Sequence, residues 1–411
     1  MRVLLVSQYF WPENFRINEL VSGMVDKGVE VEVLTGKPNY PDGKIARGYK
    51  WWSFQHEHSA GAKIFRVPLI PRGKGGAFRL AVNYLSFVLF ASVGGAWLLR
   101  GRRYDIVLVY APSPILQAVP AILISRIKGC PMVLWVQDLW PDSLSATGYV
   151  RQARLLGAMR RVVRWIYSRA DLLLVQSRAF CSPVSDMAPG KVVLYYPNSV
   201  DASFALAPTD DSSVPPEFIW NDGFTVLFAG NVGQAQAVEV IIGAAQRLKR
   251  IPNIRFLILG TGSRWGWLRE QVAAVGLSNV YLPGRFPSSA MPAFMQRADA
   301  LLVTLVDQPP FAQTVPNKVQ AYMASGRPII ASLNGEGARL VQEANAGLTA
   351  PAGDAEALAD AILELFHMPE ARRNLLGSSA RRYYLEHFEH GYLVDVLISH
   401  LRETLELSGK A

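Results

Sequence analysis

The sequence predicts an α/β protein built from two doubly wound domains, each around a mostly parallel β-sheet. Short apolar runs alternate with longer helical segments through the first 200 residues, and the alternation starts again after residue 223. The intervening segment 197–223 is rich in Pro, Ser and Asp, as linkers are. We therefore expect domains at 1–200 and 201–385, and a helical C-terminal tail at 386–411 that could pack back on the first domain.

The strands of the first half are predicted from short runs of apolar, mostly branched residues. These runs are residues 3–6, 30–34, 63–67, 106–109, 133–136, 172–175 and 192–195. The longer segments between them predict helices at 13–26, 78–99, 115–127 and 152–168. Because helices separate the strands, parallel pairing is expected.

The second half repeats this pattern. Its predicted strands are residues 225–228, 255–259, 280–282, 300–303, 329–331 and 348–349. Its predicted helices are residues 237–249, 268–275, 316–324, 337–343 and 356–366. The tail from 372 to 407 is amphipathic and is also predicted to be helical.

The composition is that of a globular protein without a metal. Half of the residues are apolar and 18% are charged. The two cysteines, Cys130 and Cys181, form no CxxC pair, and no cluster of residues has metal-ligand spacing. We therefore expect no metal and no cofactor. The apolar run at the N-terminus is too short for a signal peptide, so a cytoplasmic location is expected.

Positive charge is concentrated in the first half. Residues 1–200 carry 25 Lys and Arg against 12 Asp and Glu, a net charge of +13, and the remaining 17 and 21 give −4 for residues 201–411. This asymmetry favours an anionic lipid surface or a phosphorylated acceptor as a partner. Nucleic acid is the competing explanation, and it is disfavoured because the basic residues flank apolar helices.

Residues 80–99 form a twenty-residue stretch without a charge. Its length fits a membrane span, but its place inside an alternating α/β pattern favours a helix at the bilayer interface. A buried core helix with a solvated basic face is the alternative. The basic residues expected to contact lipid headgroups are Arg72, Lys74, Arg79, Arg100, Arg102, Arg103, Arg160 and Arg161.

The segment VPNKVQAYMASGRPIIASLNGEG, residues 315–337, contains a helix whose first turn holds Asn317 and Lys318. A lysine at a helix N-terminus is repelled by the helix dipole unless an anion lies there. The segment therefore predicts a diphosphate site, although a surface helix with a solvated lysine remains possible. Gly326 is placed to end this helix.

Two glycine-containing loops follow strands of the second half. In FAGNVG, Gly230 and Gly233 would let backbone N–H groups approach a phosphate. An ordinary tight turn is the alternative. The loop GTGSRWG at 260–266 resembles a dinucleotide fingerprint, but no acidic residue ends the next strand, so that role is not expected.

Polar and aromatic residues follow two strands of the first half. Gln137, Asp138 and Trp140 follow the run 133–136, where a carboxylate could accept a proton from an acceptor hydroxyl. Asp138 could instead cap a turn. The residues after the first strand could line a sugar-binding rim or simply pack in the loop.

Several segments together resemble family four of the retaining, nucleotide-sugar-dependent glycosyltransferases. They are YFWPENFRINEL, TGKPNYPDG, QDLWPDS, PNSVDASF, FAGNVG, PNKVQAYMASGRPII and GEGA. The resemblance implies the GT-B fold, two facing Rossmann-like domains. The chain looks most like the bacterial subgroup that builds O-antigen, capsule or colanic acid, and is similar to N-acetyl-L-fucosamine transferases.

This chain departs from the family pattern at several positions. Many members carry glutamates where Gln313 and Ala321 stand, and a histidine where Gln137 stands. Many also carry an Arg and a Lys just after the glycine loop, where Asn231 and Gln234 are found. We therefore hypothesise that Lys318 and Arg285 supply the cations and that Glu336 supplies a carboxylate.

The resemblance implies transfer of a sugar, with retention, from a UDP-sugar to a polyprenyl-diphosphate-linked acceptor at the inner face of the cytoplasmic membrane. The expected catalytic residues are Asp138, Lys318 and Glu336. The expected donor contacts are Gly230, Asn231, Gly233, Arg285, Gln313, Asn317, Lys318 and Tyr322. The expected acceptor contacts are Tyr9, Trp11, Glu13, Arg16, Gln137 and Trp140.

Two other classes remain open at this point. A UDP-sugar epimerase with the same architecture would need several placed acids and histidines, and the chain has only six histidines. A non-catalytic subunit that merely holds a nucleotide-sugar is conceivable because usual Glu and His positions are changed. An NAD-dependent oxidoreductase is the least supported, since the first strand is not followed by GxGxxG.

Overall fold

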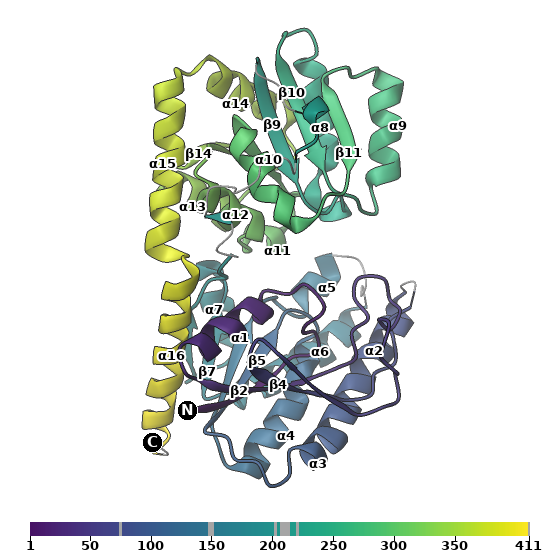
Figure 1. Cartoon of the computed structure of the whole chain (residues 1–411), viewed down its shortest axis with the longest axis vertical. Helices are drawn as coiled ribbons and strands as arrows, with labels where there is room; N and C mark the ends of the chain where they lie inside the picture. The colour runs from purple at the N-terminus through teal and green to yellow at the C-terminus, as the bar shows by residue number, and fades with distance from the viewer. Residues whose placement is uncertain (74–75, 147–151, 201–203, 206–213, 219–221, 410–411) are drawn as a thin grey trace. The chain divides into compact units, whose positions relative to one another are not determined.

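The computed structural model describes residues 1–73, 76–146, 152–200, 204–205, 214–218 and 222–409 (Figure 1). The chain forms two compact units. The first unit consists of Met1–Pro197 and His390–Ala411, and the second of Asn198–Glu389. The units divide after residues 197 and 389, whereas the sequence placed these divisions after 200 and 385.

The first unit contains an eight-stranded sheet in the order β3-β4-β2-β1-β5-β6-β7-β8. All neighbours pair in parallel except β3 and β4. The strands are β1 Arg2–Val6, β2 Glu30–Thr35, β3 Gln55–Ser59, β4 Ala62–Arg66, β5 Ile106–Ala111, β6 Met132–Val136, β7 Leu172–Val175 and β8 Val192–Tyr195.

Strand β3 was not expected from the sequence. Its residues, QHEHS, contain no apolar run, and the strand lies at the edge of the sheet. It forms through an antiparallel hairpin with β4, with Ser59 opposite Ala62. A polar edge strand is stabilised by its backbone partner and not by burial, so hydrophobic periodicity does not reveal it.

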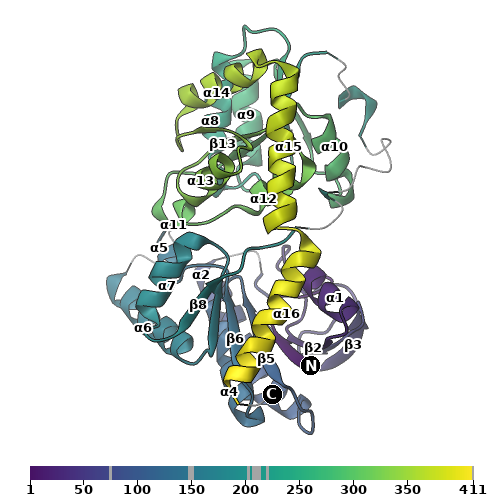
Figure 2. The same ribbon diagram turned by 90° about the vertical axis from the view of Figure 1, so that its left-hand side faces the viewer.

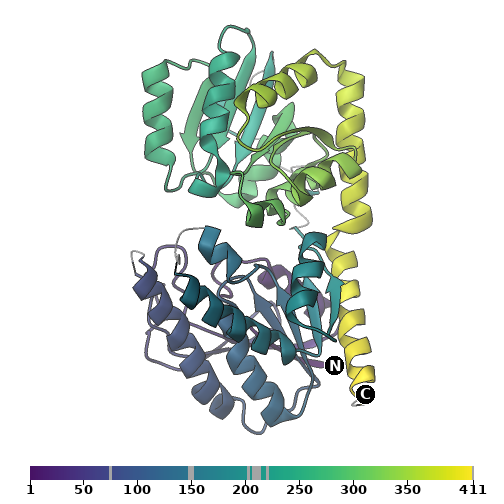
Figure 3. The same ribbon diagram turned by 180° about the vertical axis from the view of Figure 1, so that it is seen from behind.

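Helices cover both faces of this sheet (Figures 1 and 3). The helices are α1 Ile17–Asp26, α2 Ala77–Phe90, α3 Ala96–Leu98, α4 Ala118–Lys128, α5 Asp142–Ala146, α6 Ala153–Ser168, α7 Cys181–Met187 and α16 His390–Leu407. One core lies beneath α2, α4, α6 and α7. The other lies beneath α1 and α16, which run side by side (Figure 2).

The helix expected at 78–99 is interrupted. Helix α2 ends in a π-helical turn at Ala91–Gly95 before α3 begins. A Cβ atom at Gly95 would lie 2.8 Å from the Leu34 side chain of β2, so the glycine allows close packing on the sheet. The segment Ala77–Leu98 is long and apolar enough to cross a membrane, and 28% of its most apolar window is buried.

The second unit contains a six-stranded parallel sheet in the order β11-β10-β9-β12-β13-β14. Its strands are β9 Phe224–Ala229, β10 Ile254–Leu259, β11 Val280–Gly284, β12 Ala300–Thr304, β13 Ile329–Ser332 and β14 Gly347–Ala350. Its helices are α8 Val238–Arg247, α9 Trp265–Val275, α10 Met291–Arg297, α11 Pro309–Ala312, α12 Asn317–Ser325, α13 Glu336–Glu343, α14 Ala355–His367 and α15 Glu370–His387. A core lies on each face.

The tail at 372–407, which the sequence predicted to be helical, consists of two helices. Helix α15 belongs to the second unit and α16 to the first, with the break at Phe388 and Glu389. Phe388 is 1% exposed and packs in the core of the second unit, whereas Leu393 and Val394 of α16 pack in the core of the first. The segment is therefore shared between two cores, which amphipathic periodicity alone does not show.

Candidate functional site

The carboxyl ends of β9, β12 and β13 meet at one edge of the second sheet because all three strands are parallel. The loop after β9 starts at Gly230, which has a φ of 138°, a conformation that favours glycine. Gly230 N–H donates to Leu259 O at 2.9 Å, and Val232 N–H donates to Thr261 O at 3.0 Å. The Gly230 N–H is therefore bonded to β10, whereas the sequence predicted that it would face a phosphate.

Two other amides of this loop remain available. Within the part of the chain that the structure describes, the N–H groups of Asn231 and Gly233 have no protein partner. Asn231 is exposed, whereas Gly233 is buried next to the Asn231 side chain. These two groups are the backbone donors of the loop that could bind an anion.

The loop at 260–262, which follows β10, packs directly against the β9 loop. A Cβ atom at Gly260 would overlap the Gly230 carbonyl oxygen, and one at Gly262 would overlap the Val232 carbonyl oxygen. Arg264 N–H also donates to Val232 O at 2.9 Å. The glycines that resemble a dinucleotide fingerprint are thus explained by close packing of two loops.

Lys318 lies beneath the β9 loop and not in open solvent. A helical side chain points back toward the N-terminus of its helix, which brings the Lys318 stem against Gly230. Its Nζ donates to Gln236 Oε1 at 2.6 Å and lies 3.6 Å from the centre of the Phe228 ring. Burial lowers the pKa of this amine to about 7.

Tyr322 lies one turn further along α12 and is 0% exposed. Its hydroxyl accepts a hydrogen bond from Ala229 N–H at 3.1 Å, and burial raises its pKa. The structure therefore places Tyr322 as a support for the end of β9.

At the start of α12, Asn317 is exposed, and its Oδ1 accepts a hydrogen bond from Asn198 Nδ2 at 3.1 Å. Gln313 directly follows α11 and is partly buried.

The two other charges assigned to the donor site have different surroundings. Glu336 begins α13, and its carboxylate accepts hydrogen bonds from Nε and Nη2 of Arg339, both at 2.9 Å. Its charge is thus offset within the same helix. Arg285 is exposed after β11, and β10 lies between β11 and β9. Arg285 is therefore not among the residues gathered around Lys318.

Asp138 follows β6 in the first unit and is mostly buried. Its Oδ2 accepts a hydrogen bond from Ser143 Oγ of α5 at 3.0 Å. Burial raises the pKa of Asp138 to about 6, and the Ser143 hydroxyl partly opposes this by favouring the ionised form. Gln137 is partly buried beside it, and buried Trp140 donates its indole N–H to Ser113 Oγ at 3.2 Å.

Most residues of the expected sugar-binding rim are held in loop contacts. Glu13 is 6% exposed and accepts from the N–H groups of Asn39 and Tyr40, each at 2.6 Å. Its pKa is raised by burial. Tyr9 is buried and stacks on Phe15 with ring centres 5.0 Å apart. Glu13 and Tyr9 therefore pack within the loop, which was the alternative to a sugar-binding rim.

Trp11 and Arg16 keep solvent-accessible surface in this region. Trp11 is 40% exposed. Arg16 precedes α1 and pairs with Glu19 at 3.6 Å. These side chains are therefore the parts of the expected rim that a ligand could reach.

Sequence reasoning missed a buried cationic cluster next to this loop. Arg66 is 0% exposed, pairs with Glu57 and donates to the carbonyl groups of Gly36 and Trp11. Lys37 is also 0% exposed, and its Nζ donates to Gln55 Oε1 at 3.0 Å. Gln55 and Glu57 belong to β3, so the cluster could not be foreseen without that strand.

The expected membrane face has exposed apolar residues on α2 and the turns after it. They are Phe78, Leu85, Leu89, Val93 and Trp97. Leu155, Val162 and Trp165 of α6 are exposed as well. Buried Asn83 of α2 accepts from Gln8 Nε2 at 2.8 Å, which anchors the opposite face of this helix to the end of β1. One face of α2 therefore packs against the rest of the unit, and the other face is exposed to solvent.

The basic residues assigned to this face are of two kinds. Arg102 pairs with Glu32 at 2.6 Å and Arg160 pairs with Asp142 at 2.9 Å, whereas the sequence predicted that both would contact headgroups. Arg72 and Arg100 lie over the rings of Tyr40 and Trp97. Arg79, Arg103 and Arg161 are exposed, and Lys74 lies outside the described residues.

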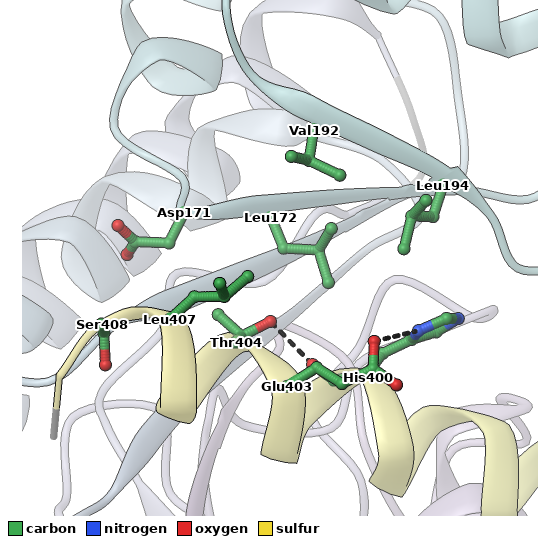
Figure 4. A pocket seen from close by; sticks show the side chains of 9 residues that line it. All are labelled: Asp171, Leu172, Val192, Leu194, His400, Glu403, Thr404, Leu407 and Ser408. Carbon is green, nitrogen blue, oxygen red and sulfur yellow. Dashed lines mark hydrogen bonds and ion pairs between the residues drawn. The ribbon is translucent and has the colours of Figure 1, made fainter. Parts of the chain in front are cut away.

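A separate pocket of about 260 Å³ lies in the first unit between β7, β8 and α16 (Figure 4). His400 and Glu403 of α16 face Leu172 and Leu194 across it (Figure 4). Asp171 directly precedes β7, so this pocket lies at the amino ends of the strands, whereas Asp138 follows the carboxyl end of β6. It contains none of the expected site residues. Over the described ranges, no group of His, Cys, Asp or Glu could hold a metal ion.

Comparison with known proteins shows similarity to glycosyltransferases along most of the chain. The family "Glycosyl transferase 4-like domain" matches residues 14–197, and "Glycosyl transferases group 1" matches residues 223–368. WcaI of Escherichia coli (strain K12), named as a colanic acid biosynthesis glycosyl transferase, is 26% identical over 317 residues, which cover 74% of this chain and 76% of WcaI.

Two further similarities extend over nearly the whole chain. O-antigen chain mannosyltransferase C of Escherichia coli is 22% identical over 428 residues, covering 99% of each chain. The crystal structure of Anabaena HepE in complex with UDP and glucose has a TM-score of 0.70 at 16% identity, covering 98% of this chain and 100% of HepE.

The two mostly parallel sheets with helices on both faces, together with the helical C-terminal region, define the GT-B fold. The chain belongs to the family 4 glycosyltransferases, and it is a transferase of this fold.

Proposed function

We propose that this glycosyltransferase moves a sugar from a UDP-linked donor to a polyprenyl-diphosphate-linked acceptor, with retention at the anomeric carbon, in the synthesis of a bacterial surface polysaccharide. The donor sugar that we propose is an N-acetylated amino sugar such as N-acetyl-L-fucosamine. The names of WcaI and mannosyltransferase C support the pathway class, and the complex of HepE with UDP supports the nucleotide.

The observation that carries this proposal is the amine of Lys318 beneath the β9 loop, at the N-terminal end of α12. Negative charge develops on the diphosphate as the bond to the sugar breaks. The amine, the helix dipole and the N–H groups of Asn231 and Gly233 would stabilise that charge. We propose that these groups, without a metal ion, offset the charge of the leaving group.

In the first unit, Asp138 is proposed to accept the proton of the acceptor hydroxyl. A carboxylate whose pKa is about 6 is ionised at neutral pH, yet it is more basic than an ordinary aspartate. Ser143 donates to Oδ2 and thereby helps to orient the carboxylate.

Substitution of Lys318 tests the donor site. Lys318→Ala should lower turnover by about two to three orders of magnitude while the protein stays folded, because one positioned donor to a leaving group has roughly that effect. Thermal unfolding and circular dichroism would verify the fold. Turnover equal to the wild type would show that Lys318 does not act on the leaving group.

We also propose that the exposed face of α2 attaches the enzyme peripherally to the cytoplasmic membrane. Apolar side chains would enter the headgroup region while Arg79 and Arg103 contact anionic lipids. This arrangement would give the active site access to a lipid-linked acceptor.

Sedimentation with anionic vesicles tests the membrane proposal. The wild type should sediment with the vesicles at low salt and less at high salt, because salt screens the electrostatic contribution. A Phe78→Ser, Leu89→Ser variant should bind less, whereas Leu375→Ser, at a position that is also exposed but lies on α15 of the second unit, should not change binding. No sedimentation of the wild type would contradict the proposal.

A donor-consumption assay separates this function from its alternatives. A transferase should consume the UDP-sugar only when acceptor is present. Consumption without acceptor and with isomerisation of the sugar would indicate an epimerase. Binding of a UDP-sugar, seen as a rise in melting temperature, without any consumption would indicate a non-catalytic subunit.

A further inference from the structure

The surroundings of the amine of Lys318, a partly buried residue, are unusual for a lysine. Its hydrogen-bond partner is Gln236 Oε1, a neutral acceptor, and its other close contact is the face of Phe228. A carboxylate partner would have held the amine permanently as an ammonium ion. The neutral amide oxygen can accept a hydrogen bond from either form of the amine, so both forms fit the same geometry.

Charged groups on the neighbouring elements have their own partners. Glu239 at the start of α8 pairs with Arg264, and Glu336 of α13 pairs with Arg339. Asp307, between β12 and α11, accepts from Asn334 Nδ2 at 2.9 Å. Tyr322, the titratable residue one turn along α12, has its hydroxyl on Ala229. None of these carboxylates is paired with Lys318 in the described part of the chain.

Gln236 is itself held firmly. Its backbone carbonyl accepts a hydrogen bond from Thr304 Oγ1 of β12, and its N–H donates to Gly233 O at 3.1 Å. The neighbouring Ala235 carbonyl accepts from Val306 N–H at 3.1 Å. The next residue, Ala237, is the N-cap of α8 and has a φ of 44°. The turn that carries Gln236 is thus fixed to β12, and the side chain keeps the amine under the β9 loop.

We propose that the Lys318 amine takes up one proton when the donor diphosphate binds, and that Gln236 is the positioning residue that holds this amine in place. The proton comes from the solution, and no covalent bond is formed. This proposal rests on the proposed function, because it requires a nucleotide diphosphate at the β9 loop.

The proton uptake follows from the two opposing effects on the amine. Burial favours the neutral form, whereas the Phe228 face favours the charged form, so the free enzyme holds a mixture near neutral pH. A dianionic diphosphate beside the amine would favour the charged form strongly. Since the pKa of the Lys318 amine rises on binding, the affinity for the diphosphate should fall as the pH is raised above the pKa that this amine has in the free enzyme.

Isothermal titration calorimetry with UDP tests the proposal directly. Near pH 8 the terminal phosphate of UDP is already ionised, so proton uptake would come from the protein. Titrations in buffers of different ionisation enthalpy should show an uptake of about one proton per UDP. The affinity should also fall by about tenfold per pH unit between pH 8 and 9.

Variants at two positions test whether Lys318 takes up the proton and whether Gln236 positions its amine. Lys318→Arg should still bind UDP but without proton uptake, because a guanidinium is always charged. Gln236→Glu should abolish the uptake by holding the amine as an ammonium ion, and Gln236→Met should abolish it by releasing the amine to solvent. Gln234→Met, an exposed neighbour in the same turn, should behave like the wild type.

The outcomes separate this inference from the proposed function. UDP binding without proton uptake, or uptake that persists in Lys318→Arg, would overturn the inference and leave the glycosyltransferase assignment intact. Uptake that is unchanged in Gln236→Met would overturn the positioning role of Gln236. Failure of UDP and of every UDP-sugar tested to bind the wild type would contradict the proposed function as well.

Discussion

At the residue scale, burial brings the pKa values of the two proposed catalytic groups closer to 7, upward for the carboxyl group and downward for the amine. Burial raises the pKa of Asp138 to about 6 and lowers the pKa of Lys318 to about 7. Each side chain has a neutral hydrogen-bond partner, Ser143 and Gln236 respectively. Both groups can therefore change protonation state near pH 7, which suits proton transfer at one site and anion binding at the other.

The pH dependence of turnover tests the role of Asp138. Because only the ionised carboxylate accepts a proton, kcat/KM should rise with pH through a midpoint near 6. Asp138→Asn should lower it by about two to four orders of magnitude. Ser143→Ala should move the midpoint upward, because Ser143 stabilises the ionised form. An unchanged midpoint in Ser143→Ala would argue against this carboxylate as the titrating group.

Stability should follow the same titration with a defined sign. The raised pKa means that the folded protein binds the Asp138 proton more tightly than the unfolded chain does. This contribution to stability is present below pH 4 and is lost as the pH rises through 6. Asp138→Asn should therefore melt no lower than the wild type at pH 8, which thermal unfolding would show.

At the scale of elements, the donor site depends on two loops that touch through glycines. The β9 loop is backed by the β10 loop, and the contact leaves no room for a Cβ atom at Gly260. The sequence showed these glycines but not their purpose, since a fingerprint-like pattern and a packing contact need the same residue type. The parallel pairing of β9 with β10 brings the two loops together.

Substitution at Gly260 tests this support. Gly260→Ala should push the Gly230 carbonyl outward and weaken UDP binding by at least tenfold, because the β9 loop must move to make room. Gly284→Ala is the matched control, since its φ of 93° carries similar strain but no atom lies within 4 Å of the added Cβ. Both affinities can be measured by calorimetry. Equal affinities in the two variants would contradict the contact.

At the scale of the whole molecule, the last helix of the chain completes the first unit. Leu397 and Leu401 of α16 are 0% exposed and lie in the core that α1 and β1 also form. The core of the first unit is therefore incomplete without residues 390–407, which follow the second unit in the sequence.

A charge in α16 should destabilise the first unit. Leu397→Asp places an unpaired carboxylate in the core, which should lower the free energy of unfolding by roughly 4 kcal/mol or more. Leu407→Asp, at a position that is 88% exposed, should have little effect. Denaturant titration would measure both. A small effect of Leu397→Asp would show that α16 is not needed for this core.

Much of the fold could be predicted because apolar runs mark buried strands directly. The runs at 172–175 and 192–195 are strands with the same bounds. Edge strand β3, the π turn at Ala91–Gly95 and the break after α15 were not predictable, since each depends on a partner distant in the sequence. At the site, Lys318 could be singled out by its place in the first turn of a helix and Asp138 by its place after a strand, but Gln236 and Ser143 could not.

The sequence by itself determined the two α/β sheets and the glycosyltransferase family, because both are written in local runs and motifs of adjacent residues. Only the tertiary structure decided which charges are neutralised and which remain available. Glu336, Arg102 and Arg160 are paired, while the Lys318 amine has a neutral partner. The physical reason is that pairing and burial depend on distances in space, which the order of residues along a chain does not specify.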